Sequence, residues 1–363
     1  MAIRLAFVDS NRSYIEKLTA WINKFMPHQF SIEILTSPES FETWTKSGVK
    51  ADLTAVSIDL FKDVQPLLPK EGILVLDDGS HQVIEADVPR ISKYRPAEEL
   101  MKDILSVCAD RLPKMHIREG RALKITLISY LDGSDTVSPV APYIAYLFNN
   151  RGRKVFYLSL EQNQVTDLYF CGNNNRGLNE MLYYAKSNKD NLSMRLETCT
   201  GTDTNTGIDF LKAPPGLLVS GDIEAGDIDK LLSAAGERNI YDEVVLVADM
   251  SMNDKFIHML KKADRILFVS SNTAGSCLKF MKFLKGLKWQ DFDPDLLFVK
   301  LRLVLIKLCV SCDFYEQFPN ISKVYIQPNA IADSAASWLP PEADLSVLDN
   351  AINNIDMGEK KHE

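Results

Sequence analysis

The stretch LKITLISYLDGSDTVSPVAPYIAYLFNNRGRKVFYLSLEQ, residues 123–162, decides the fold of the second half of this chain. It consists of an apolar strand, a short polar loop, a helix, a basic turn and a second apolar strand. In a parallel sheet such a unit binds phosphate groups at the helix N-terminus. The loop, however, carries Asp132 and Asp135, where glycine and lysine would favour a phosphate. The stretch therefore predicts the frame of a nucleotide site that is filled with the wrong charges.

Strand and helix patterns alternate on both sides of this stretch. In the first half, strands are expected at 3–9, 30–37, 51–59, 72–79 and 88–92, and helices at 13–26, 39–48 and 96–112. In the second half, the apolar strand patterns are ITLIS, KVFYLSL, GLLVSG, EVVLVAD, RILFVSS and LRLVLIKL. Such alternation is typical of parallel sheets with helices on both faces. We expect an α/β protein with two doubly wound parallel-sheet domains.

The length of 363 residues also favours two domains, because it exceeds the usual size of one. The segment PKMHIREGRA is charged and has no periodicity, which indicates a linker. We therefore expect a first domain at 1–112, a linker at 113–122, a second domain at 123–356 and a disordered tail at 357–363.

Composition limits the classes of partner. The net charge of −8 disfavours nucleic acid as a partner, because its phosphates repel an acidic chain. No apolar run reaches the length of a membrane span, since LRLVLIKLCV is short and interrupted by Arg302 and Lys307. Six scattered cysteines indicate a reducing cytosol rather than a disulfide framework, and the pair at 309–312 indicates packing more than a metal site.

Polar residues stand at strand ends in the first half, where open parallel sheets hold their chemistry. Residues 1–112 resemble the receiver domain of bacterial response regulators. That resemblance places Asp9 and Ser10 at the magnesium-binding acidic pair, and Lys93 at the phosphate-contacting lysine. Ser57 then occupies the phosphoacceptor position, with Asp59 two residues later. The resemblance implies a pseudo-receiver pocket of Asp9, Ser57, Asp59 and Lys93 that has lost its acceptor. Asp59 as a displaced acceptor is the alternative.

The loop within 123–162 resembles the deviant Walker loop of the MinD/ParA class, K-G-G-x-G-K-T. Leu131 stands at the signature lysine, and Asp132 and Gly133 stand at the glycine pair. The third glycine, the loop lysine and the magnesium-binding threonine correspond to Asp135, Thr136 and Val137. Asp132 and Asp135 repel a triphosphate, and both lysines that would offset its charge are missing. Two prolines, Pro139 and Pro142, also remove N–H groups from the helix start.

Other parts of the second half continue this resemblance. Ser159 and Glu161 stand at the acidic D-x-D positions of the class, and Asp249 lies two residues beyond the Walker B position at Val247. The resemblance implies a degenerate nucleotide site with no catalytic residue and no metal ligand assigned. Its candidate cofactor-binding residues are Gly133, Ser134, Thr136, Ser138, Glu161 and Asp249. No cofactor is certain, and ATP with magnesium stays open.

The order of a receiver-like domain followed by a MinD/ParA-like domain resembles that of the TadZ/CpaE family of Flp pilus assembly proteins. That resemblance implies a cytoplasmic localisation and scaffold factor that acts as a homodimer with pilus or secretion proteins. It implies a place at the cell pole or the inner face of the membrane, with at most peripheral membrane association. The alternatives are an ATP-binding MinD/ParA-type switch ATPase and an atypical response regulator.

Two helical patterns in the second half have open assignments. Lysines recur every third residue at Lys279, Lys282, Lys285 and Lys288, either as a basic face for a membrane or acidic partner or, as we expect, as the solvated side of a helix. Leu278, Met281, Leu284 and Leu287 would then face the sheet. Helix 277–289 is also a candidate dimer surface. The pattern at 345–355 predicts a helix that docks on its own domain.

Overall fold

The computed structural model describes residues 2–27, 29–80, 88–111, 123–132, 139–172, 174, 176–216, 223–237, 240–288, 294–306, 313–326 and 338–359. The chain forms two compact units. The first comprises Met1–Ile117 and Asn188–Thr198, and the second comprises Arg118–Ser187 and Cys199–Glu363.

The first unit contains a five-stranded parallel sheet with the strand order β2-β1-β3-β4-β5. This is the flavodoxin-like order of doubly wound folds. Its strands are β1 (Ile3–Val8), β2 (Phe30–Leu35), β3 (Leu53–Ser57), β4 (Ile73–Asp77) and β5 (Arg90–Ser92). Its helices include α1 (Arg12–Phe25), α2 (Pro38–Lys46), α3 (Ile58–Val64), the short η1 (Gln65–Leu67), α4 (Ala97–Arg111) and, by contact, α8 (Leu192–Cys199).

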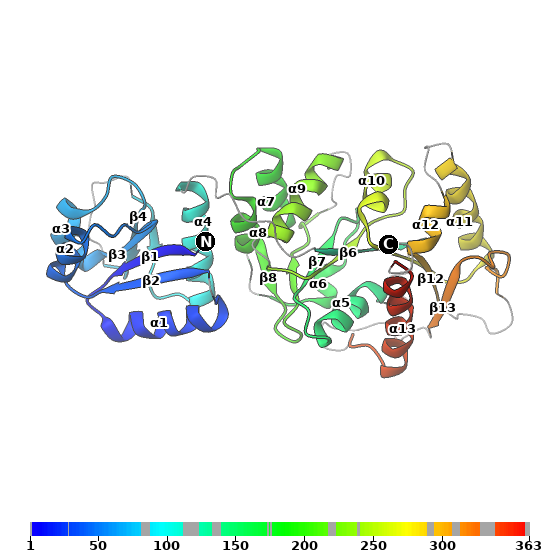
Figure 1. Ribbon diagram of the computed structural model, residues 1–363, viewed down its shortest axis with the longest axis horizontal. Helices are drawn as coiled ribbons and strands as arrows, with labels where there is room; N and C mark the ends of the chain where they lie inside the picture. Colours follow the sequence, from blue (N-terminus) through cyan, green and yellow to red (C-terminus); the bar gives the residue numbers. More distant parts are fainter. Residues whose placement is uncertain are drawn as a thin grey trace. The chain divides into compact units, whose positions relative to one another are not determined.

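Helices cover both faces of this sheet (Figure 1). Side chains alternate along β1, so Leu5 and Phe7 face α1 and α4, whereas Ala6 and Val8 face α2 and α3. Capping side chains fix the helix starts. The Asn11 side chain accepts from the backbone N–H of Tyr14 at 3.1 Å and begins α1.

The strand expected at 51–59 is too long by two residues at each end. β3 ends at Ser57 and α3 begins at once at Ile58, because Ile58, Phe61 and Val64 recur at helical spacing and are buried against the sheet. Asp59 therefore lies in the first turn of a helix rather than on a strand.

Residues Asn188–Thr198 pack within the first unit, although they lie inside the range expected for the second domain. Met194 is buried in the core shared by α1 and α4. Arg195 donates to the carbonyl oxygen of Ala109 at 3.2 Å and forms an ion pair with Asp110 at 2.7 Å. The segment thereby satisfies a carbonyl in the last turn of α4.

The second unit contains an eight-stranded sheet with the order β13-β12-β11-β6-β10-β7-β9-β8, in which only the β8–β9 pairing is antiparallel among the described residues. Its strands are β6 (Lys124–Tyr130), β7 (Val155–Ser159), β8 (Thr200–Thr202), β9 (Asp209–Leu211), β10 (Glu243–Val247), β11 (Arg265–Ser270), β12 (Leu301–Ile306) and β13 (Ser322–Ile326). Its helices include α5 (Val140–Asn150), α6 (Thr166–Tyr169), α7 (Leu178–Lys186), α9 (Ala225–Gly236), α10 (Asp254–Lys262), α11 (Ala274–Leu287), α12 (Pro294–Lys300) and α13 (Glu342–Glu359).

Two layers of helices enclose this sheet (Figure 1). α5 and α13 cover one face, where Trp338 packs among the rings of Tyr143, Tyr146 and Phe170. On the other face, Phe256 of α10 and Phe283 of α11 contact Phe268 of β11. The predicted fold class, two doubly wound parallel sheets, is confirmed.

Some strands of the second unit differ from the expectation. The pattern GLLVSG falls almost wholly on 217–222, outside the described residues. β8, β9 and β13 were not expected, because the first two have three residues each and β13, SKVYI, has five residues without a strict apolar–polar alternation in the sequence. Periodicity is a weak signal in strands this short.

The face of α11 that meets the sheet is also not the expected one. Cys277, Phe280, Phe283 and Leu287 are buried, whereas Leu278 is 51% exposed. The phenylalanine side chains take the inward positions because they bury more apolar area than the leucine side chains would. All four lysines of the row are exposed, as expected.

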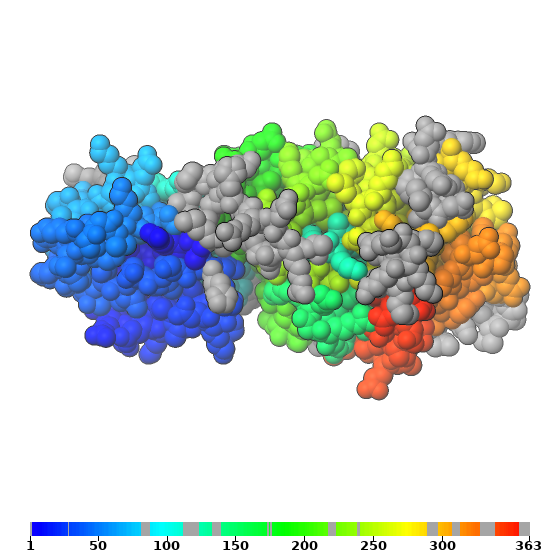
Figure 2. Space-filling model, in the orientation of Figure 1, coloured from blue at the N-terminus to red at the C-terminus, as the bar shows by residue number. Residues whose placement is uncertain are grey.

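The helix expected at 345–355 docks on its own unit, which confirms that prediction. Leu348, Ile352 and Ile355 of α13 are buried against the sheet, and Asp349 forms an ion pair with Arg151 just after α5. α13 lies beside α5 at the surface (Figure 2). No helix in the described part of the chain is long and apolar enough to cross a membrane.

Candidate functional site

The carboxyl ends of β1 and β5 in the first unit hold a buried ion pair. Asp9 follows β1 and Lys93 follows β5, and the Nζ of Lys93 lies 2.6 Å from Oδ2 of Asp9. Their side chains are 0% and 5% exposed, so this pair is removed from solvent. The other carboxylate oxygen of Asp9 accepts from the backbone N–H of Asn11 at 2.8 Å. The lysine charge is therefore directed at a carboxylate of its own chain.

Tyr14 of α1 covers this ion pair. The Nζ of Lys93 lies 5.1 Å from the centre of the Tyr14 ring, and the hydroxyl of Tyr14 donates to the carbonyl oxygen of Lys93 at 2.7 Å. Burial, together with the neighbouring Asp9 carboxylate, raises the pKa of Tyr14 to about 12. The phenol is thus held neutral, as a donor.

Ser57 and Asp59 form a second contact at the same edge of the sheet. The hydroxyl of Ser57 donates to Oδ1 of Asp59, and the hydroxyl of Ser10 donates to Oδ2 at 2.6 Å. Burial raises the pKa of Asp59, but the donations from Ser10 and Ser57 and the charge of Lys93 lower it by more, so the net pKa is lowered. The four residues expected in this pocket thus form two bonded pairs, Asp9–Lys93 and Ser57–Asp59.

The loop of the second unit is only partly described. Gly133, Ser134, Asp135, Thr136, Val137 and Ser138 lie outside the described residues. Asp132 is described, and its Oδ2 accepts from the backbone N–H of Ser271 at 3.0 Å and from the Ser271 hydroxyl. The first carboxylate of the loop is thereby tied to the residue after β11.

The N-terminus of α5 follows this loop and has few free amide groups. Pro139 is the N-cap residue, and Pro142 in the first turn also lacks an N–H. The N–H of Ala141 donates to the hydroxyl of Tyr130 at 3.1 Å, and the N–H of Tyr143 donates to the carbonyl of Pro139 at 3.0 Å. Among residues 139–143, only Val140 keeps an amide that neither a proline nor these bonds account for.

A phosphate at a helix N-terminus needs several converging amide groups. Among the described residues 139–143, the start of α5 offers few such groups, because two residues are prolines and the amide of Ala141 donates to Tyr130.

Glu161 and Asp249 lie at the same edge of the sheet, since they follow the adjacent strands β7 and β10. Oε2 of Glu161 accepts from the Ser159 hydroxyl at 3.0 Å, and Oδ2 of Asp249 accepts from the backbone N–H of Gln162 at 2.6 Å. Glu161 is buried and Asp249 is exposed. In the described part of the chain, no group of three His, Cys, Asp or Glu side chains is placed to hold a metal ion.

Sequence reasoning missed the polar cluster after β11. The hydroxyl of buried Tyr315 donates to Ser270 at 2.9 Å, and Ser270 donates to Ser276 at 2.9 Å. Asn272 adopts a left-handed backbone, with φ of 53°. The run Ser270-Ser271-Asn272 after a buried strand was the available signal, because small polar residues mark a strand end. The hydrogen bond between Ala141 and the Tyr130 hydroxyl had no signal in the sequence, because Tyr130 ends an apolar strand and reads as a core residue.

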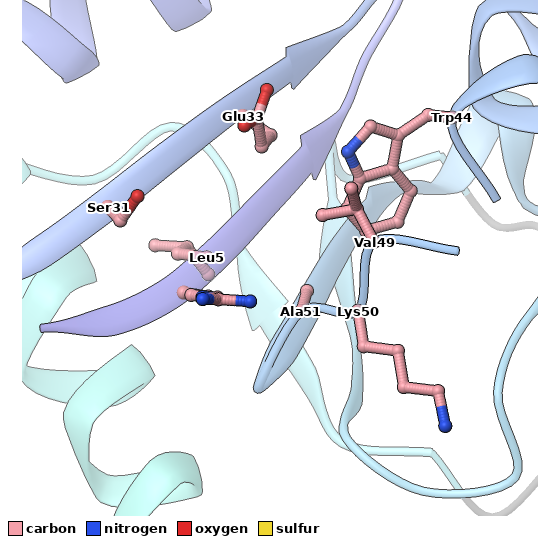
Figure 3. Close-up of a pocket in the computed structure, with 8 residues that line it drawn as sticks. Leu5, Ser31, Glu33, Trp44, Val49, Lys50 and Ala51 are labelled. Atoms are coloured by element: carbon pink, nitrogen blue, oxygen red, sulfur yellow. The ribbon is translucent and has the colours of Figure 1, made fainter. Parts of the chain in front are cut away.

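A surface pocket of about 310 Å³ lies on the first sheet, among residues that the sequence did not single out. Trp44 of α2 and the connection Val49–Ala51 line one side, and Ser31 and Glu33 of β2 line the other (Figure 3). Arg4 and Leu5 lie near the start of β1, whereas Asp9 and Lys93 lie beyond the strand ends. This pocket is therefore separate from the Asp9–Lys93 site.

Together these features define the class of the protein: a two-unit α/β chain with doubly wound parallel sheets whose candidate sites lie at the strand ends. No protein-family model matches the chain. No curated protein matches it either.

Solved structures similar to the chain are ATPases of the ParA and MinD families. A ParA family ATPase from Chlorobium tepidum is 15% identical, with a TM-score of 0.49, and the match covers 65% of this chain and 98% of that one. A putative plasmid partition protein from Borrelia burgdorferi, bound to AMPPNP, is 13% identical over 67% of this chain and all of that one, with a TM-score of 0.45. MinD in its complex with MinC from Aquifex aeolicus is 15% identical over 66% and 95%, with a TM-score of 0.43.

Proposed function

We propose that this chain is a scaffold and localisation factor of a Flp-type pilus assembly machine. In this proposal its second unit is a MinD/ParA-like domain with a degenerate nucleotide site, and its first is a pseudo-receiver. The observation that supports the degeneracy is the start of α5, just after the loop, where two prolines lack an N–H and the N–H of Ala141 donates to Tyr130. The pilus role rests on the resemblance of the domain order to the TadZ/CpaE family.

The first unit supports a role in contacts rather than in phosphotransfer. The strand order β2-β1-β3-β4-β5 is the one that receivers share with flavodoxin. Its Lys93 charge, however, is neutralised by buried Asp9, and Ser57 stands where an acyl phosphate would need a carboxylate. The sheet and its surfaces are thus kept, while the switch chemistry is absent from position 57.

A second candidate is a working ATP-dependent switch. One observation favours it: Glu161 and Asp249 present two carboxylates at one edge of adjacent strands, where a magnesium ion would need them. Each of them already accepts a hydrogen bond within the chain, from Ser159 and from Gln162.

Genetic complementation separates the two candidates. A host strain lacking this gene would receive the wild-type protein or the double variant Glu161→Gln, Asp249→Asn, which keeps both hydrogen-bond acceptors but removes both charges. A scaffold predicts pili at the wild-type level with either protein, at equal protein abundance. Loss of pili with the double variant alone would favour the switch. Normal pili in the strain without the gene would contradict the pilus role itself.

A further inference from the structure

Helix α11 presents an exposed basic face. Its sequence, AGSCLKFMKFLKGL, contains no acidic residue, and Lys279, Lys282 and Lys285 on the helix and Lys288 at its C-cap are all exposed. None of these four lysines forms an ion pair within the described residues. Four unneutralised cations on fifteen residues stand out in a chain whose net charge is −8.

The packing of α11 fixes this face toward solvent. Phe280 and Phe283 contact Phe268 of β11, with ring centres 6.1 and 5.4 Å apart. The helix cannot rotate its lysines inward without exposing these rings. The basic face is therefore a permanent surface of the second unit, on the side of the sheet that also carries α10 (Figure 1).

Apolar side chains accompany the lysines. Leu278 is 51% exposed beside Lys279 and Lys282, and Met252 is 38% exposed where it lies against Gly286. A Cβ at Gly286 would come within 2.9 Å of the end of the Met252 side chain. Exposed apolar side chains thus accompany the lysines at both ends of the helix: Leu278 on α11 itself, and Met252, which precedes α10, against Gly286.

We infer that this face of α11 binds an anionic lipid surface. Lysine on a flexible stem suits a diffuse array of lipid phosphates, whereas protein interfaces are depleted in lysine and favour arginine. A phosphodiester backbone would leave Leu278 and Met252 in water, but the headgroup boundary of a bilayer would bury them. The inference goes beyond the scaffold role, and it holds or fails independently of nucleotide binding.

Vesicle binding tests this inference. Purified full-length protein would be sedimented with vesicles of phosphatidylcholine alone or mixed with phosphatidylglycerol. We expect binding to the mixed vesicles only, weakening as salt rises because screening shortens to about 10 Å at 0.1 M. The double variant Lys282→Gln, Lys285→Gln should lose roughly 25-fold in affinity, at roughly fivefold per lysine. A matched control is Lys186→Gln, Lys189→Gln, which removes two exposed lysines outside α11 and should bind as wild type.

The variant Leu278→Ser distinguishes lipid from other polyanions. It should lose several-fold in vesicle affinity without changing the salt dependence, because one exposed leucine contributes burial and not charge. Three results would overturn the inference: no binding to phosphatidylglycerol vesicles, equal binding by the Lys282/Lys285 and Lys186/Lys189 variants, or tighter binding to duplex DNA than to vesicles with Leu278→Ser unchanged. The last would assign the face to nucleic acid.

Discussion

At the scale of single residues, charged side chains at the strand-end sites form ion pairs or hydrogen bonds within the chain. Lys93 meets Asp9, Asp59 meets two hydroxyls, and Asp132 meets Ser271. In a working receiver or nucleotide site, the corresponding groups would be available to bind phosphate or magnesium. In our proposal, serine at position 57 removes the phosphoacceptor, while its hydroxyl donates a hydrogen bond to Asp59.

The pseudo-receiver pocket should resist phosphorylation. Incubation with acetyl phosphate and magnesium should leave the protein unmodified by mass spectrometry, because Ser57 cannot form the acyl phosphate and its hydroxyl donates to Asp59. An acid-labile adduct on Asp59, or an acid-stable one on Ser57, would refute this. A response regulator with an intact acceptor aspartate serves as the positive control.

The lowered pKa of Asp59 should appear in the acid stability of the protein. A carboxyl whose folded-state pKa is depressed stabilises the fold above its unfolded pKa of about 4, and this stabilisation is lost as pH falls through the folded value. The Tm difference between wild type and Asp59→Asn should therefore be constant near neutral pH and shrink below about pH 4. A difference that is the same at pH 7 and pH 3 would exclude this linkage.

At the scale of elements, the sequence predicted the long apolar strands. It did not predict packing faces or contacts between residues far apart in the sequence. The strand frames around residues 3–8, 124–130 and 243–247 were predictable, because long apolar runs between turns allow one pattern. The inward face of α11 was not predictable, because leucine and phenylalanine are both apolar and occur at helical spacing. In the structure the phenylalanines are buried. The hydroxyl of Tyr130 reaches Ala141, a partner eleven residues away that no local pattern indicates. The docking of Met194 in the first unit depends on contacts equally remote in sequence.

In our proposal, the loop and the start of α5 weaken the binding of ATP. The variant Asp132→Gly, Asp135→Gly, Thr136→Lys, Val137→Thr should regain ATP affinity by roughly two decades. Each like charge removed and the lysine added contribute on the order of 1 kcal/mol, and a decade is about 1.4 kcal/mol. Adding Tyr130→Phe should improve binding further, because it frees the amide of Ala141.

Hydrolysis should not return to the same extent in these variants, since Leu131 still stands at the signature lysine. Isothermal calorimetry with ATP and magnesium measures the affinities, and circular dichroism checks the fold. Tyr130→Phe alone is the matched control, and it should bind no better than wild type. A folded four-residue variant that binds no ATP would contradict the role assigned to loop charge.

At the scale of the whole molecule, the chain combines two doubly wound sheets, and our proposal assigns it the role of a scaffold that acts as a homodimer. We expect it to be a dimer at micromolar concentration by light scattering. Lys282→Gln, Lys285→Gln should remain a dimer, because the basic face of α11 is assigned to lipid and not to the second copy. A monomeric wild-type mass would contradict the scaffold proposal, and a monomeric lysine variant would place the dimer contact on α11.

Calorimetric titration of the native protein with ATP and magnesium tests most directly whether the nucleotide site of the second unit is degenerate. The described start of α5 offers few amide donors, and the loop carries two carboxylates and lacks both lysines of the class that it resembles. We expect no saturable heat up to millimolar ATP. A millimolar Kd corresponds to a binding free energy of about −4 kcal/mol, so any binding should be weaker than this. Saturable, magnesium-dependent binding at micromolar ATP would contradict it, and would show that the site still holds nucleotide despite its prolines and carboxylates.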